Sequence, residues 1–475
     1  MRTPKHRAAR VVVIGGGISG LSAAHRLIEL SSKNAINTEV LLLEGSGRLG
    51  GVISTKVKDE LILEEGPDSF ITTKPRALDL CLRVGLESNI LETNDETRRI
   101  FVARRDKLVP IPEGFSFAPT RIRPFVMSPL FSLLGKLRMS LDIVLPRRNS
   151  KEDESVESFF TRRLGREAFN LLVQPLLSGI YGADPGKLSI RATLPHLAEM
   201  EEKHGSIIRA VREFARSKNG ASNGSATRRY NQFISLQNGM NEFVEVLASR
   251  LPEGGIRLYK SVRKLARNEK GWSVLTKDNE SINADGVIVA VPAIHASALV
   301  RGFDPQLGDY LSDIKYSSSI VINLIYNRKD FSYPLDGVGF VVPKTENTPI
   351  TACTFSSVKF PGRTPPETVH LRCVIGGAAT SEAHDRDDAW LTDIAHNTLS
   401  PLLGITSEPL FGVVSRNPES LPQYAVGHPE HIARIDTRVQ HYSGLELAGN
   451  AYSGVGIPDC VRSGEEAAER LLNRT

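Results

Sequence analysis

The chain has 475 residues, of which 40% are hydrophobic, with 39 glycines and 27 prolines. This composition is typical of a globular protein of two or three domains and excludes a collagen-like, low-complexity or disordered chain. The formal net charge is only +5, too little for a surface dominated by nucleic-acid binding. The four cysteines lie far apart without a CxxC pair, so neither a zinc site nor a disulfide framework is expected, and a reducing compartment fits.

The first elements form a βαβ unit of the nucleotide-binding type. Residues 10–14 read as a buried strand, 18–30 as an amphipathic helix and 39–43 as a second strand. The turn between the first strand and the helix reads Gly15-x-Gly17-x-x-Gly20. Glycines there permit a tight turn and let backbone amides approach a pyrophosphate at the N-terminus of the helix. The unit therefore predicts a dinucleotide site.

A second motif follows the second strand. Glu44 ends that strand, where it could accept hydrogen bonds from the ribose hydroxyls of an adenosine. In the segment Gly47-Arg48-Leu49-Gly50-Gly51, the arginine could face phosphates, and the two glycines would let the main chain pass close to a flat ring. The alternative for Arg48 is a solvated loop arginine. Together with Glu44, this motif is typical of two-dinucleotide-domain flavoproteins of the amine oxidase type, so we expect FAD.

The middle of the chain is basic and then helical. A helix is predicted over 75–85, and residues 98–148 hold eleven Lys or Arg against three acids. This basic segment could be a solvated helix face, a contact with anionic lipid headgroups, or a site for substrate carboxylates. Helical patterns cover 154–179 and 188–215. A polar, glycine-rich loop over 217–225 has no predicted function.

No stretch of the sequence is expected to cross a membrane. The longest plausible one, residues 124–135, is well short of the ~20 residues that a spanning helix needs. We therefore expect a cytoplasmic protein, with a peripheral position at the inner face of the cell membrane left open.

The second half of the chain is rich in predicted strands. They cover 257–265, 272–276, 286–291, 318–326 and 369–375.

A last strand over 444–448 is followed by a small-residue turn and a helix over 457–472. This helix could aim its positive end at a ligand, although a purely structural turn is the alternative. His428-x-x-His431 has the spacing of metal ligands, but Pro429 lies between the histidines and no carboxylates complete a site. We interpret it as a surface loop.

Together these motifs resemble the oxygen-dependent protoporphyrinogen oxidase family, which includes bacterial members that act on coproporphyrinogen III. The matching segments follow the family order over nearly the whole chain. They are residues 15–20, 44–51, 65–70, 174–182, 447–452 and 454–460.

The resemblance implies an α/β flavoprotein with two dinucleotide-binding domains, a mixed-sheet substrate domain and a helical domain. The implied division is a discontinuous Rossmann-like FAD domain (1–94, 232–295 and 440–475), a helical domain (95–215), a flexible loop (216–231) and a substrate domain (296–439). The motifs and the resemblance together give the FAD contacts as Gly15, Gly16, Gly17, Ile18, Ser19, Gly20, Glu44, Gly45, Arg48, Gly51, Val52, Gly66, Pro67, Asp68, Ser69, Val262, Asn450, Val455, Gly456 and Ile457.

The implied reaction belongs to heme biosynthesis. It is the six-electron oxidation of protoporphyrinogen IX or coproporphyrinogen III, with oxygen as the acceptor and hydrogen peroxide as the product. Arg99, or Arg98 if the alignment slips by one, would pair with a substrate propionate. No catalytic base and no metal are assigned.

Two other functions are weighed against this one. The first is an amine, polyamine or carotenoid oxidoreductase on the same fold. Amine oxidases typically frame the flavin with two aromatic residues, and near the C-terminal motif this chain offers only Tyr452. The second is a non-enzymatic escort protein, against which Glu44 and Arg48 argue. The expected partners are a porphyrinogen and oxygen, with no nucleic acid; a homodimer, a membrane contact and handover to a downstream heme-pathway enzyme are left open.

Overall fold

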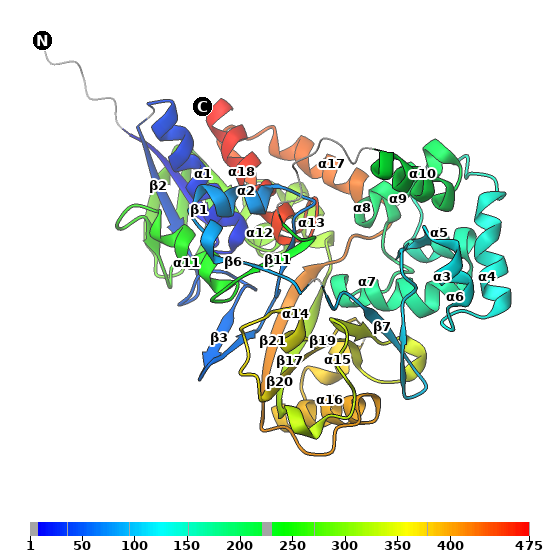
Figure 1. Cartoon of the computed structure of the whole chain (residues 1–475). Coiled ribbons are helices and arrows are strands. Elements are labelled where there is room, and N and C mark those ends of the chain that lie inside the picture. The colour runs from blue at the N-terminus through cyan, green and yellow to red at the C-terminus, as the bar shows by residue number, and fades with distance from the viewer. Residues whose placement is uncertain are drawn as a thin grey trace, which may run out of the picture.

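A parallel sheet of five strands lies at the upper left of the molecule, close to the C-terminal helix (Figure 1). The computed structural model describes residues 8–474 except 36, 95, 151, 221–229, 270 and 378. The strand order is β12-β2-β1-β16-β22. The strands are β1 (Ala9–Ile14), β2 (Thr38–Leu43), β12 (Ile256–Arg257), β16 (Gly286–Val289) and β22 (Leu445–Leu447). Because they come from distant parts of the chain, the predicted discontinuous Rossmann-like sheet is confirmed.

Side chains that alternate along β1 separate two hydrophobic layers. Val11 and Val13 face one layer, and Val12 and Ile14 face the other. The first layer contains α1 (Ile18–Lys33), α2 (Arg76–Arg83), α11 (Asn241–Ser249) and α18 (Ile457–Arg474). The second contains α12 (Ala293–Val300), α13 (Pro305–Asp313), α17 (His428–Val439) and an antiparallel sheet of β13 (Val262–Asn268), β14 (Gly271–Thr276) and β15 (Ser281–Ala284). Burial on both faces explains why β1 is a continuous apolar run.

A second large sheet has seven strands and lies at the bottom of Figure 1. In order they are β21 (Phe411–Pro422), β17 (Tyr316–Asn327), β20 (Thr368–Ile375), β19 (Ile350–Phe355), β18 (Gly339–Val341), β7 (Ile100–Arg104) and β8 (Lys107–Pro110). Only the β18–β7 pair is parallel, so the sheet is mixed, as predicted. Helices α15 (Ala379–Ala383) and α16 (Asp388–Leu403) contact its strands.

Short helices form the lobe at the right of Figure 1. They are α3 (Ile122–Met127), α4 (Leu133–Ser140), η2 (Leu141–Ile143), α5 (Val156–Leu164), α6 (Arg166–Ala168), the π-helical turn η3 (Phe169–Val173), α7 (Gln174–Tyr181), α8 (Ile190–Thr193), α9 (Pro195–His204) and α10 (Ile207–Gly220). In its core Arg163 is fully buried and donates from Nε to Asp142 Oδ1 at 2.6 Å.

The two long helical stretches expected over 154–179 and 188–215 are interrupted, which corrects the prediction. Gly165 (φ +90°) and Gly205 (φ +68°) end helices in backbone conformations that favour glycine. Pro195 begins a new helix because its missing N–H cannot continue the preceding one.

Short elements connect these lobes. They are β3 (Thr55–Lys58), β4 (Leu61–Glu64), β5 (Phe70–Ile71), η1 (Glu87–Asn89), β6 (Ile90–Glu92), β9 (Phe115–Ser116), β10 (Ala118–Pro119), β11 (Phe233–Leu236), η4 (Arg328–Asp330), η5 (Lys344–Glu346) and α14 (Ser356–Lys359). Among the helices that the structure describes, none has the length and apolar character required to cross a membrane.

Three groups of strands and helices fall outside the segments in which we expected them from the sequence. Strands β7 and β8 fall in the segment assigned to the helical domain, yet they pair with β18 of the mixed sheet. Helices α12, α13 and α17 lie wholly or mostly in the segment assigned to the substrate domain, yet they pack on the parallel sheet. Helix α10 continues to Gly220 inside the expected loop, of which 221–229 fall outside the described residues. Long-range pairing is not visible in local sequence patterns.

Candidate active site

The turn between β1 and α1 lies against the loop that follows β2. Gly16 donates its backbone N–H to Glu44 Oε2 at 2.7 Å, and Ser46 donates to Glu44 Oε1 at 2.7 Å. Gly50 donates to the Gly16 carbonyl at 2.8 Å. The structure therefore brings the two glycine motifs together, and the two backbone donors fix the direction of the Glu44 carboxylate.

The N-terminus of α1 is shaped to hold an anion. Its N-cap, Gly17, makes no side-chain cap hydrogen bond, and a Cβ added there would meet nothing within 4 Å. By contrast, a Cβ at Gly20 would overlap the Gly15 carbonyl oxygen. Uncapped amides at the positive end of a 16-residue helix beside open space fit the pyrophosphate of FAD.

Arg48 is exposed and lies along its own loop. Its Nη2 donates to the Gly51 carbonyl at 2.6 Å and its Nη1 to the Ile53 carbonyl at 3.1 Å. These bonds leave Nε and one Nη2 hydrogen without an intramolecular acceptor among the described residues. Arg48 therefore shapes the loop through Gly51 and Val52 and keeps donors for a phosphate.

The predicted contact Val262 starts β13, directly beside the Glu44 loop. Its neighbour Ser261 lies close to Gly45, because a Cβ added at Gly45 would be only 2.7 Å from Ser261 Oγ. Lys260 donates its backbone N–H to the Glu44 carbonyl at 2.8 Å. Val262 therefore lies on the same side of the site as Glu44.

The segment from Gly66 to Ser69 is packed on the same loops. A Cβ at Gly66 would overlap the carbonyl oxygen of Val52, so the two backbones approach in a way that only glycine allows. Across the mixed sheet, Asn323 donates to the Glu64 carbonyl, Asn417 to the Glu65 carbonyl and Arg372 to the Gly66 carbonyl. Side chains of three strands thus fix this segment.

Asp68 is paired with Lys359 at the end of α14. Lys359 Nζ lies 2.9 Å from Asp68 Oδ2, and the Ser69 hydroxyl donates to Asp68 Oδ1 at 2.7 Å. Burial alone would raise the pKa of Asp68, but Lys359 and Arg372 outweigh it and hold that pKa well below its usual value. The Asp68 side chain therefore binds α14, which contacts β19 and β20 of the mixed sheet, and the predicted FAD contacts Gly66 to Ser69 are anchored there.

The C-terminal turn is organised by Tyr424. Its hydroxyl donates to the Asn450 carbonyl and accepts from the Gly454 N–H, the latter at 2.8 Å. Asn450 donates from Nδ2 to the Ser420 carbonyl at 3.0 Å. Val455 and Gly456 then lead into α18, which begins at Ile457.

The interpretation of His428-x-x-His431 as a surface loop is wrong. Both histidines lie on α17, where Pro429 occupies the first turn as prolines can. His428 is buried and stacks on the Tyr424 ring at 4.1 Å between centroids, and burial lowers its pKa to about 4. His431 contacts the Tyr310 carbonyl at 2.7 Å.

Arg98 and Arg99 lie in a separate cleft of about 1000 Å³ between the start of the mixed-sheet strand β7 and the helical lobe. Its walls are mainly apolar, and its charged lining residues within the described part of the chain are Glu96, Arg98, Arg99 and Glu113. Arg98 donates to Asn231 Oδ1 at 2.9 Å, and Arg99 Nη1 lies 2.7 Å from Asp336 Oδ2. The apolar lining residues are Ile100, Pro110, Ile111, Pro112, Phe115, Phe117, Pro124, Met127, Pro129, Leu172 and Leu176.

The cleft wall and the C-terminal turn share one hydrophobic cluster. Leu176 of the cleft and Val455 of the turn both pack against the core of the helical lobe, which includes Tyr424. The candidate cofactor turn and the candidate substrate cleft are therefore joined through packed side chains.

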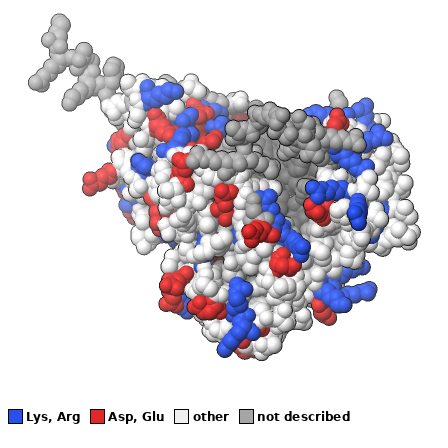
Figure 2. Space-filling model, viewed as in Figure 1, with Lys and Arg blue, Asp and Glu red and all other residues white. Residues whose placement is uncertain are grey.

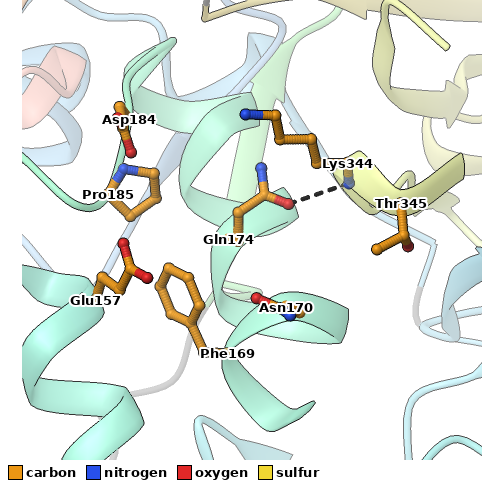
Figure 3. Close-up of a pocket in the computed structure, with 8 residues that line it drawn as sticks. All are labelled: Glu157, Phe169, Asn170, Gln174, Asp184, Pro185, Lys344 and Thr345. Carbon is orange, nitrogen blue, oxygen red and sulfur yellow. Dashed lines mark hydrogen bonds between the residues drawn. The ribbon is translucent and has the colours of Figure 1, made fainter. Parts of the chain in front are cut away.

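A smaller pocket, of about 290 Å³, lies beside α7 (Figure 3). Gln174 points towards η5 in this view, and its Oε1 accepts the backbone N–H of Lys344 at 3.2 Å. Glu157 and Asp184 lie on the opposite side. This pocket contains none of the predicted site residues. The hydrogen bond to Gln174 joins α7 to η5.

The fold and the paired glycine loops define a two-dinucleotide-domain flavoprotein. The family model for flavin-containing amine oxidoreductases matches residues 18–472. Coproporphyrinogen III oxidases of Staphylococcus aureus and Bacillus subtilis are each 34% identical to the chain, with alignments over 97% of this chain and 98% and 97% of theirs. A solved structure from Exiguobacterium sp. 255-15, described as a candidate protoporphyrinogen oxidase, is 29% identical with a TM-score of 0.86 and covers 99% of this chain and all of its own.

The chain belongs to the flavin-containing amine oxidoreductase family and, within it, to the oxygen-dependent protoporphyrinogen oxidase family that includes the coproporphyrinogen III oxidases. It is an oxidoreductase, and its cofactor is FAD.

Sequence reasoning missed the residues that hold these segments in place. Tyr424, Lys359, Arg372 and Asp336 belong to no motif, and their partners are distant in the chain, by 291 residues for the Lys359–Asp68 pair. No local pattern could have linked them.

Proposed function

We propose that the protein oxidises a porphyrinogen to the porphyrin with oxygen as the acceptor, and that coproporphyrinogen III is its preferred substrate. The cleft at Arg99 carries this proposal. A porphyrinogen is a large apolar macrocycle with carboxylate arms, which suits apolar walls with cations at one end. The names of the Staphylococcus and Bacillus relatives support the same substrate class.

Bound FAD supplies a hydride acceptor and passes the electrons to oxygen. The α1 amides and the directed Glu44 carboxylate would bind its pyrophosphate and ribose. The N-terminus of α18, after Val455 and Gly456, would orient its positive end towards the ring. Arg99, with Arg98 as the alternative, would hold a propionate while the apolar walls exclude water. No catalytic base is assigned, because aromatisation of the macrocycle drives loss of the pyrrole protons.

The names of the Staphylococcus and Bacillus relatives favour coproporphyrinogen III over protoporphyrinogen IX. The former carries four carboxylates and the latter two. The basic segment 98–148 supplies Arg98 and Arg99 to the cleft, where Glu96 and Glu113 also lie. The test is kcat/KM for both porphyrinogens in air, on the FAD-loaded protein, with a polyamine as a third substrate. A higher value for coproporphyrinogen III supports the proposal. Oxidation of the polyamine alone would replace it with an amine oxidase.

The helical lobe would rest on an anionic membrane surface. Eight apolar side chains on α3, α4 and the turn after them are between 49% and 78% exposed, more than an ordinary solvated face presents. Arg121, Arg123 and Lys136 lie among them, and basic side chains outnumber acidic ones over this lobe in Figure 2. The apolar side chains are Ile122, Val126, Met127, Leu133, Leu134, Leu137, Leu141 and Val144. Cations around an apolar face suit anionic headgroups.

The division into FAD, helical and substrate domains is proposed with β7 and β8 moved to the substrate domain and α12, α13 and α17 to the FAD domain. A homodimer and handover to a downstream heme-pathway enzyme stay predictions of the sequence.

A further inference from the structure

We infer that Asp336 competes with substrate carboxylates for Arg99 and thereby limits how tightly the cleft binds a porphyrinogen. The inference rests on the proposed function, because it concerns the same cleft. Arg99 Nη1 lies 2.7 Å from Asp336 Oδ2. An internal carboxylate thus already occupies the guanidinium that the proposed substrate needs.

The fold fixes Asp336 beside Arg99. Arg99 directly precedes β7, and Asp336 lies shortly before β18. Because β7 and β18 pair in parallel, both residues lie at the same end of the two strands. Val338 donates its backbone N–H to the Arg99 carbonyl at 2.9 Å. A Cβ at Gly337 would lie 2.6 Å from that carbonyl oxygen and would overlap the Phe101 ring. Glycine at 337 therefore lets the Asp336 loop approach Arg99 closely.

The loop is further restrained around Asp336. Leu335 is buried and has φ +52°, an uncommon conformation for a leucine that the surrounding packing must hold. Burial, followed by the charge of Asp336, raises the pKa of Tyr333 to about 12. Tyr333 therefore stays a neutral neighbour, and Arg99 is the cation that Asp336 faces.

The contact is easily displaced. The side chain of Arg99 is 68% exposed and that of Asp336 is 40% exposed, and exposed ion pairs contribute little stability. The pair uses one terminal nitrogen of Arg99, so a substrate carboxylate can bind the remaining donors. While Asp336 holds Nη1, a substrate carboxylate has fewer Arg99 donors available, so it binds less tightly than it would to an unpaired guanidinium.

The test is Asp336→Asn in the FAD-loaded protein. Titration with coproporphyrin III, followed by its fluorescence, measures binding without turnover. We expect the Kd to fall about two- to five-fold, the range that exposed ion pairs give, and the KM for coproporphyrinogen III to fall with it. Asp309→Asn is the matched control, since Asp309 forms an exposed 2.7 Å pair with Arg301 on another surface. An unchanged Kd, or weaker binding, would overturn the inference.

A double variant separates action through Arg99 from a general charge effect. In an Arg99→Ala background, Asp336→Asn should change the Kd no more than the Asp309 control does. A full effect in that background would show that Asp336 acts without Arg99 and would overturn the inference. If the wild-type protein binds coproporphyrin III and Asp336→Asn has the same Kd, the inference is wrong but the proposed function stands. A wild-type protein that neither binds the porphyrin nor oxidises the porphyrinogen defeats the proposed function, and the inference with it.

Discussion

Lys359 and Asp68 form an ion pair of 2.9 Å whose side chains are only 15% and 12% exposed. The pair joins the segment Gly66 to Ser69 of the candidate cofactor site to α14, which contacts the strands β19 and β20 of the mixed sheet. Since the backbone at Gly66 also contacts Val52 and Arg372, the candidate cofactor loops and the mixed-sheet lobe form one continuous structure. This is the physical basis for expecting that changes in either region alter both.

Replacing Lys359 with Met should destabilise the protein by about 3 kcal/mol at neutral pH, because a buried carboxylate then lacks its partner. The measurement is urea unfolding of the FAD-loaded protein, with Lys329→Met as the exposed control. The double variant with Asp68→Asn should recover part of the loss. A change as small as that of the control would contradict the account.

The loss of unfolding free energy in Lys359→Met should depend on pH, in a direction that the pKa of Asp68 sets. The pKa of Asp68 is lower in the folded protein than its unfolded value of ~3.9. The pair therefore stabilises the fold above that unfolded pKa, and this stability is lost only as the pH falls through the lower folded pKa. In Lys359→Met the buried carboxylate protonates more easily, so the difference from the wild type should shrink as the pH is lowered towards 4. A difference that grows on acidification would contradict this assignment.

Glu44→Gln should weaken FAD binding about 10- to 100-fold. The carboxylate accepts N–H groups from Gly16 and Ser46, and hydrogen bonds to a charged group contribute about 1.5–3 kcal/mol. The measurement is the Kd of the apoprotein for FAD by calorimetry. Glu39→Gln, on the strand β2 that precedes Glu44 and paired at the surface with Arg10, should leave the Kd unchanged. Equal effects of the two variants would remove Glu44 from the site.

Arg99→Ala should raise the KM for coproporphyrinogen III about tenfold, since a charge-assisted hydrogen bond at an exposed position is lost. The FAD content, read from the flavin absorbance, should stay that of the wild type. Arg98→Ala decides between the two arginines. If Arg98→Ala alone raises the KM, then Arg98 is the propionate ligand and Arg99 is not.

Leu134→Glu should weaken binding to anionic vesicles about tenfold or more, because a leucine buried in lipid contributes about 1.5–3 kcal/mol. Leu134 is 78% exposed. The measurement is co-sedimentation with phosphatidylglycerol vesicles and with phosphatidylcholine vesicles. Leu410→Glu, at a 53% exposed leucine of the mixed-sheet lobe, is the control. If the wild-type protein binds neither phosphatidylglycerol nor phosphatidylcholine vesicles, the membrane proposal is wrong.

The strands that local patterns predicted mostly lie within a few residues of an observed strand, but the patterns missed many others, such as β19 and β21 of the mixed sheet, and the run predicted over 257–265 is divided between β12 and β13. The apolar runs over 10–14 and 39–43 became β1 and β2, and that over 369–375 became β20. The long helical patterns failed because Gly165 and Gly205 adopt positive φ, which hydrophobic periodicity does not reveal.

The candidate site likewise contains residues that a local motif predicts and residues that it does not. The glycines and Glu44 follow from a short motif, and the structure places them in contact. Asp336 was not predictable, because it lies 237 residues from Arg99 in the chain and meets it only through the pairing of β18 with β7.

The central claim is that this flavoprotein oxidises a porphyrinogen with oxygen. The most direct measurement is the oxygen consumed per coproporphyrin III formed when the FAD-loaded protein receives coproporphyrinogen III. Removal of six electrons predicts three molecules of oxygen consumed and three of hydrogen peroxide released per porphyrin. Porphyrin formation no faster than with free FAD alone would contradict the claim.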